Sequence, residues 1–173
     1  KGLVDRQVTR IVTAGTLYED DLLDRRANNF LVAVHPGERV AGLAWLDVST
    51  GAFTVAVVPR EKVGDELSRL DPSEVLLPES WLREPGELVQ EIARACPAPR
   101  VPAPEWTFQH GNAVETLHEV LGVATLEGFG LDEGSPAIPA AGAALEQHIQ
   151  AGKARFLSAS ADTTESSNPG ETK

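Results

Sequence analysis

The stretch that most constrains the fold is residues 40–58, where two apolar, β-branched runs flank the turn formers Ser-Thr-Gly at 49–51. This pattern predicts a β-hairpin. The first run is more continuously apolar than a strand with one face in water, so we expect a central strand covered on both faces. After the turn, Phe53, Val55 and Val57 alternate with smaller side chains. The period of two therefore predicts a sheet face of large residues on which helices can pack.

Asp47 stands at the end of the first run and has three interpretations, one of which is that it begins a phosphate-binding turn. Alternatively, it would be one corner of a two-metal nuclease, which needs several carboxylates converging on cations about 3.5–4 Å apart. Asp71, Glu74 and Asp132 are the further carboxylates available to such a site. The interpretation that we favour is that the Asp47 side chain caps the turn.

Length and composition exclude several classes of protein. The 173 residues suit one domain with a short appendage and would make two full domains cramped. No run approaches the roughly 20 apolar residues of a membrane span, and the first residues lack a signal pattern, so we expect no membrane partner and a cytoplasmic location. Cys96 is the single cysteine, which excludes an internal disulfide or a thiolate metal cluster.

The net charge of −11 is unevenly distributed. Residues 1–39 carry six basic and six acidic side chains, whereas residues 40–173 carry nine basic and twenty acidic ones. Non-specific nucleic-acid binding depends on Lys and Arg that neutralise phosphates. The main body of the chain is therefore expected to bind nucleic acid poorly.

Strands and helices alternate on either side of the hairpin. A strand over 30–34 should end in a turn that leaves His35 exposed. After the hairpin we predict, in order, a helix through Val63, Leu67 and Leu70, a strand at 74–77, a helix from Pro85, an extended connector at 97–104, and a short strand at 106–108 with the rings of Trp106 and Phe108 on one face.

The next helix is predicted from a capping box formed by Asn112 and Glu115 and ends at Gly122. Its apolar face carries Val114, Leu117 and Leu121, with His118 beside it as a boundary residue.

Two further predictions concern the end of the chain. The sequence Gly-Phe-Gly at 128–130 indicates a turn around one buried ring. An Ala-rich helix should then run from Ser135 or Ile138 to about Lys153, followed by a disordered polar tail at 158–173.

Three sequential strands followed by alternating helices and strands is the order of the ribonuclease-H-like α/β fold, with a mixed sheet of about five strands and flanking helices. Several segments also resemble successive pieces of bacterial MutS mismatch-repair proteins. These are Gly2 to Arg6 with Val8, Arg10, Val12-Thr13 and Gly15-Thr16; Asn28-Asn29-Phe30-Leu31; Gly42-Leu43-Ala44 with Leu46-Asp47, Ser49-Thr50-Gly51 and Phe53; Leu76 to Glu79; Trp106 with Phe108; Gly128-Phe129-Gly130; and Ala140-Ala141-Gly142 with Leu145.

The resemblance covers roughly residues 1–154 and implies a domain organisation. Residues 1–27 would be the linker from an absent mismatch-reading domain, and 28–135 the ribonuclease-H-like connector domain. Residues 136–157 would form the first helix of the core domain, and 158–173 the tail.

The resemblance also implies a function. The chain would be a non-catalytic connector that transmits ATP-dependent conformational change and docks a MutL-type partner. It would contact other MutS domains, and mismatched duplex DNA through the parent protein. No cofactor is expected in this chain, and ATP and Mg belong to the full-length parent.

The sequence departs from the family pattern in four respects. Ala14 stands where proline is usual, no Phe-x-Glu motif is present, and no Gly-x-x-x-x-Gly-Lys-Ser/Thr motif occurs. The tail differs from the lever helices expected next, so we expect a fragment or a truncated gene product.

Candidate site residues follow from helix geometry and charge. The wheel that turns Leu117 inward turns Glu115, Thr116 and Glu119 outward, and these three are the candidate partner-docking residues. The candidates for weak DNA contact are Lys1, Arg6, Arg10, Arg25 and Arg26. Two alternatives stay open: an active ribonuclease-H-like nuclease that uses Asp47, and a free-standing adaptor made by a truncated gene.

Overall fold

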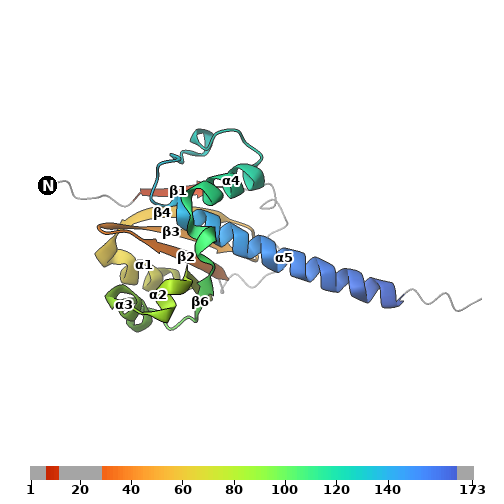
Figure 1. The fold of residues 1–173 in the computed structure, drawn as a ribbon, viewed down its shortest axis with the longest axis horizontal. Coiled ribbons are helices and arrows are strands. Elements are labelled where there is room, and N and C mark those ends of the chain that lie inside the picture. The colour runs from red at the N-terminus through yellow and green to blue at the C-terminus, as the bar shows by residue number, and fades with distance from the viewer. Residues whose placement is uncertain (1–6, 12–28, 167–173) are drawn as a thin grey trace, which may run out of the picture.

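One mixed sheet runs through the computed structural model, which describes residues 7–11 and 29–166, and the side chains of residues 29–152 (Figure 1). The strands are β1 (Gln7–Ile11), β2 (Phe30–Pro36), β3 (Val40–Asp47), β4 (Phe53–Pro59), β5 (Glu74–Pro78) and β6 (Arg100–Ala103). Their order is β1-β4-β3-β2-β5-β6. The pairs β1·β4, β4·β3 and β3·β2 are antiparallel, and the pairs β2·β5 and β5·β6 are parallel. This arrangement confirms the α/β class and the mixed ribonuclease-H-like sheet.

The predicted hairpin is confirmed as β3 and β4, which pair from Val40 opposite Pro59 to Leu46 opposite Phe53. Gly51 adopts a φ of 75° in the turn, a conformation that glycine reaches without steric cost. Every residue of β3 after Val40 is buried, so the strand is covered on both faces as its apolar run predicted.

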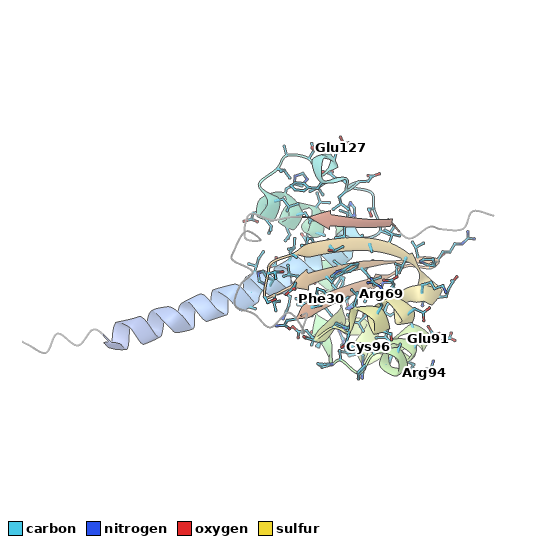
Figure 2. The ribbon with its side chains drawn as sticks, turned by 180° about the vertical axis from the view of Figure 1, so that it is seen from behind. Phe30, Arg69, Glu91, Arg94, Cys96 and Glu127 are labelled. Carbon is cyan, nitrogen blue, oxygen red and sulfur yellow. The ribbon has the colours of Figure 1, made fainter. Side chains whose placement is uncertain are left out.

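One face of the sheet is covered by α1 (Val63–Leu70), α2 (Glu79–Arg83) and α3 (Glu87–Ala95). The buried cluster on this face contains side chains of the sheet together with one stripe of α1 and one of α3. Its members from these two helices are Val63, Leu67, Leu70, Leu88, Val89 and Ile92. The i, i+4 and i+7 spacing of the α1 residues is the periodicity that predicted this helix. Cys96 follows α3 and is buried in the same cluster, where it packs against apolar neighbours (Figure 2).

The opposite face is covered by α4 (His110–Leu121) and α5 (Ile138–Ser166), with the 3₁₀ turns η3 (Glu105–Phe108) and η4 (Glu127–Phe129) at its margin. The first eight residues of α5 lie over β2 and β3, and the C-terminal part of the helix projects beyond the sheet (Figure 1). No helix among the described residues is long and apolar enough to cross a membrane.

Two glycines allow α5 to pack closely on its neighbours. A Cβ on Gly42 of β3 would lie 2.1 Å from the carbonyl oxygen of Pro136, just before α5. A Cβ on Gly142 of α5 would lie 2.4 Å from the Cβ of Ala113 in α4. Both separations are far below van der Waals contact, so these positions admit only hydrogen as a side chain.

The two edge strands of the sheet come from segments that were not predicted to be strands. Residues 7–11 fall within the predicted linker, yet they form β1 and pair with β4. On the other edge β6 comes from the predicted connector at 97–104, and the predicted strand at 106–108 is the 3₁₀ turn η3. A 3₁₀ turn advances about 120° per residue, so residues two apart point in different directions. Trp106 is accordingly 46% exposed whereas Phe108 is 5% exposed.

His35 was predicted to be exposed, and this prediction is wrong. β2 continues to Pro36, so His35 pairs with Gly42 as a strand residue. Its ring stacks on Phe108 with centroids 5.8 Å apart. Burial lowers the pKa of His35, and the nearby Glu105 carboxylate partly opposes this effect.

The C-terminal helix is longer than predicted. α5 continues past Lys153 to Ser166 and so includes residues 158–166, which the sequence analysis assigned to the tail. The sequence supplies a reason, since neither glycine nor proline occurs between 153 and 168 to end the helix. Residues 167–173 lie outside the described residues. The division of the chain at 135 and 136 between two domains stays a prediction, although the start of α5 is part of the sheet's core.

The first prediction concerns the contact between β3 and α5. Gly42→Ala should lower the free energy of unfolding by about 1–3 kcal/mol, because its Cβ meets backbone atoms that cannot rotate away. Gly111→Ala in α4 is the matched control, since nothing lies within 4 Å of its added Cβ. It should leave stability unchanged or raise it by up to about 1 kcal/mol. Urea unfolding measures both, and equal stability of the two variants would contradict the close contact.

Candidate functional site

The candidate docking face is the outer side of α4, which packs against α5 through its inner side. Ala113 and Leu117 are the buried residues of α4. Val114 and Leu121 are only partly buried, so the predicted apolar face is centred one residue away from its expected position. The reason is the close approach of Gly142, which places the small Ala113 at the helix crossing.

The three candidate docking residues lie away from this crossing. Glu115 and Glu119 are exposed, and Thr116 is half-buried. The structure therefore places the two glutamates on the outward side of the helix and Thr116 at its margin. Their role in docking stays a prediction.

The N-terminus of α4 is held differently from the predicted capping box. The helix begins at His110, with Gln109 as its N-cap, so Asn112 lies within the first turn. The Asn112 side-chain amide donates to the backbone oxygen of Trp106 at 3.1 Å and to Oε1 of Gln109 at 3.0 Å. These bonds tie α4 to η3. The prediction failed because Asn112 hydrogen-bonds to preceding residues and not to the backbone N–H groups that follow it.

The C-terminus of α4 ends at Gly122, as predicted, with a φ of 65°. His118 in the last turn contacts two acceptors: Nδ1 lies 2.8 Å from the Val123 carbonyl oxygen, and Nε2 lies 2.8 Å from Oε1 of Glu133. These two hydrogen bonds raise the pKa of His118. Sequence analysis placed His118 at the boundary but missed Glu133. A partner fifteen residues away across a loop leaves no periodic signal.

The buried side chain near η4 is Leu126, not the expected ring. Leu126 is fully buried, whereas Phe129 is only partly buried. The turn is built as predicted, since Gly130 has a φ of 70° and its N–H donates to the Glu127 carbonyl oxygen.

Charge on this side of the molecule has one sign. Residues 101–152 contain no Lys or Arg. Their acidic residues are Glu105, Glu115, Glu119, Glu127, Asp132, Glu133 and Glu146. The layer that carries the candidate docking face is therefore negative throughout its described surface.

Most of the candidate DNA-contact residues cannot be placed. Lys1, Arg6, Arg25 and Arg26 lie outside the described residues. Arg10 lies in β1, where it pairs with Thr54 of β4. A DNA-contacting role for these five residues stays a prediction.

Asp47 caps the hairpin turn, as the favoured interpretation predicted. Its Oδ1 accepts hydrogen bonds from the backbone N–H of Ser49, at 2.9 Å, and from the Ser49 hydroxyl. Its backbone accepts from Gly51 at 2.7 Å and donates to Ala52 at 2.9 Å. Asp47 is 7% exposed, so these bonds satisfy a nearly buried carboxylate.

The carboxylates that a nuclease would need lie on different faces of the sheet. Asp47 is two residues from Trp45, which packs toward α1 and α3, whereas Glu74 is two residues from Leu76, which packs toward α4 and α5. Strand alternation therefore points Asp47 and Glu74 to opposite faces. Asp132 follows Leu131 on the α5 side, and Asp71 ends α1 on the other. No group of three or more potential metal ligands occurs among the described residues.

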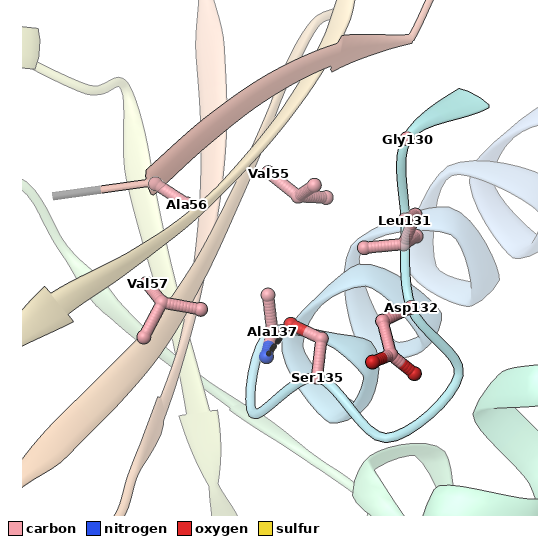
Figure 3. Close-up of a pocket in the computed structure, with 8 residues that line it drawn as sticks. All are labelled: Val55, Ala56, Val57, Gly130, Leu131, Asp132, Ser135 and Ala137. Atoms are coloured by element: carbon pink, nitrogen blue, oxygen red, sulfur yellow. Dashed lines mark hydrogen bonds between the residues drawn. The ribbon is translucent and has the colours of Figure 1, made fainter. Parts of the chain in front are cut away.

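Two pockets flank the α4 and α5 layer. Figure 3 shows the first, between β4 and the segment before α5, lined by Val55, Ala56, Val57, Gly130, Leu131, Asp132, Ser135 and Ala137. Its polar side chains are engaged locally: Ser135 Oγ accepts from the N–H of Ala137, and Asp132 Oδ1 accepts from that of Gly134. The second pocket lies between the start of β2 and α5, and Glu74, Gln147 and His148 are among its lining residues. Neither pocket gathers a catalytic set of groups.

The family model described as MutS domain II matches residues 29–159, which is most of the chain and includes every described strand except β1.

The second prediction tests the cap of the hairpin turn. Asp47→Ala should lower the free energy of unfolding by about 1–2 kcal/mol, because two donors on Ser49 lose their acceptor. Asp47→Asn keeps the Oδ1 acceptor, so it should lower the free energy of unfolding by less than Asp47→Ala does. Urea unfolding of the two variants beside the parent chain measures both losses. If both variants lower the free energy of unfolding equally, the carboxylate charge has a role beyond capping.

Proposed function

The chain belongs to the MutS family of mismatch-repair proteins as its domain II, a non-catalytic connector, and on this premise we propose that it transmits ATP-dependent conformational change and docks a MutL-type partner. The match to MutS domain II carries the connector assignment. The geometry of α5 and α4 supports the two finer roles.

The support for transmission is the way α5 is anchored. All eight of its first residues, 138–145, are buried, and its junction with β3 and its crossing with α4 are close contacts at Gly42 and Gly142. The helix then projects to Ser166. At about 1.5 Å per residue, its 29 residues span roughly 43 Å. A displacement of the projecting end would therefore be passed to the sheet by a helix that is fixed at its other end.

The support for docking is the outward side of α4. The helix is held by α5 on its inner side, by η3 at its start and by Glu133 near its end, and rigid elements present binding groups more accurately than loops do. Glu115 and Glu119 are exposed, and residues 101–152 contain no Lys or Arg. We propose that a MutL-type partner reads this face with basic or polar groups, since complementary charge favours encounter and register.

Family membership implies contact with other MutS domains, and with DNA through the parent protein. We further propose that ATP and Mg act in the parent, that this chain requires no cofactor, and that the protein works in the cytoplasm. Direct DNA contact by this chain would be weak and confined to Lys1, Arg6, Arg10, Arg25 and Arg26. The acidic body would repel phosphate.

The third prediction tests the docking face. Thr116→Arg with Glu119→Lys should weaken capture of the MutL-type partner by about 1–3 kcal/mol, because it reverses the charge of an outward surface. Neither side chain is buried, so circular dichroism and the unfolding midpoint should stay close to those of the parent chain. Biolayer interferometry with the purified partner measures the affinity.

A matched control is available on the other face of the sheet. Glu87→Lys with Gln90→Arg makes the same change of charge on exposed positions of α3. This control should leave the affinity unchanged. Equal weakening by both double variants would show a general charge effect, and no weakening by either would remove α4 as the docking site.

The fourth prediction concerns DNA. Binding of duplex DNA to this chain should be weaker than micromolar at about 150 mM salt. The slope of log K against log salt should be no steeper than about −4.5, the value for five cationic contacts. Fluorescence anisotropy over a salt series measures both quantities. Sub-micromolar binding that survives replacement of the five candidate residues by Glu would contradict the prediction.

A further inference from the structure

The hydrogen bonds of His118 specify its protonation state. Its Nδ1 faces the Val123 carbonyl oxygen and its Nε2 faces Oε1 of Glu133, each at 2.8 Å. A backbone carbonyl and an ionised carboxylate only accept hydrogen bonds, so both ring nitrogens must donate. A neutral imidazole has one N–H and would lose one of the two bonds. The geometry therefore fits the imidazolium form.

These bonds connect α4 to the segment that leads into α5. Residues 123–137 contain one turn of 3₁₀ helix, and their side chains Leu126 and Leu131 are buried in the core. The backbone hydrogen bonds of residues 126–134 in the described chain join members of the segment, such as Leu131 to Leu126 and Ser135 to Asp132, whereas the Ser135 carbonyl oxygen accepts from Ile138 of α5. The bond from His118 to Glu133 is thus the described hydrogen bond that ties the far part of this segment to α4.

The charge that acts on the ring is that of the Glu133 carboxylate, and the other ionised side chains of residues 101–152 are also carboxylates. On α4 itself the charged neighbours are Glu115 and Glu119. The elements packed against α4 carry Glu105 in η3, Glu127 in η4, Asp132 and Glu133 in the following segment, and Glu146 in α5. Of these, Glu133 forms an ion pair with the ring. The His118 side chain is 25% exposed and the Glu133 side chain is 49% exposed. No Lys or Arg occurs in residues 101–152 to compete for the carboxylate.

We propose that His118 is a proton-dependent latch that holds residues 123–137 against the last turn of α4. In its protonated form the ring bridges Val123 and Glu133. Loss of the proton breaks one bridge and allows the segment to open locally. The latch acts on the junction between α4 and α5 whether or not α4 docks a partner.

The direction of the pH effect follows from linkage. The closed segment binds the proton more tightly than the open one, because the hydrogen bonds to Val123 and Glu133 raise the pKa of His118 above the ordinary value of about 6.5. The stabilisation is fully present below that ordinary value and is lost as the pH rises through the raised pKa. One proton limits the change in the opening equilibrium to about tenfold per pH unit.

The fifth prediction tests the latch in the complete chain. Ring-proton NMR should give His118 a titration midpoint above 6.5, and Glu133→Gln should lower it. Hydrogen exchange, corrected for intrinsic rates, should show protection of residues 126–134 falling by up to about tenfold per pH unit as the pH rises from about 6.5 through the raised pKa of His118, with no further fall above it. Amides of β3, buried on both faces, should keep their protection over the same range. His118→Gln should abolish the pH dependence of the segment.

Glu127→Gln is the matched control, since it removes a carboxylate from the same segment. Glu127 lies in η4 and is exposed, at the outer end of the molecule in Figure 2. This variant should leave the midpoint and the pH dependence unchanged. If His118→Gln fails to fold, the NMR titration midpoint of His118 and its shift in Glu133→Gln still test the proposal. A midpoint at or below 6.5, or one that Glu133→Gln does not move, would overturn the proposal.

Discussion

The burial of β3 on both faces is the constraint on which the rest of the structure depends. A strand with apolar side chains on alternate sides cannot leave either side in water, so each face of the sheet needs a helical layer. The α1 and α3 stripe covers Trp45 and Leu43, and α5 covers Ala44 and Leu46. The alternation of strand and helix after the hairpin provides these layers in sequence.

The second layer is built on unusually close contacts, and this makes its helices one mechanical unit. Gly42 lets the chain before α5 lie directly on β3, and Gly142 lets α4 cross α5 at Ala113. An α-carbon hydrogen is the only group that fits at either position, so the contact is set by backbone against backbone. The helix proposed to transmit movement and the helix proposed to dock a partner are therefore packed against one another, which gives a physical route from one role to the other.

Hydrogen bonding compensates for the one-sided charge of this layer. Like charges spread along α4, η4 and the following segment repel one another, and no Lys or Arg of residues 101–152 offsets them. His118 supplies the compensating cation when it is protonated, and Glu105 is occupied by the Ser80 N–H at the start of α2. Glu115 and Glu119 stay exposed on α4, where a partner of opposite charge would find them.

Local pattern in the sequence was enough for the hairpin, the central strand, the α1 stripe, the turn cap at Asp47 and the end of α4 at Gly122, because each depends on residues within a few positions of one another. It also placed Glu115 and Glu119 outward, since a helix has a fixed period, whereas Thr116 is half-buried. Tertiary structure alone decided the strands β1 and β6, whose short sequences become strands by pairing with an existing edge. It also decided the stacking of His35 on Phe108, the separation of Asp47 from Glu74, and the bond between His118 and Glu133. Each of these joins or separates residues that are distant in the chain, and no local period encodes that distance.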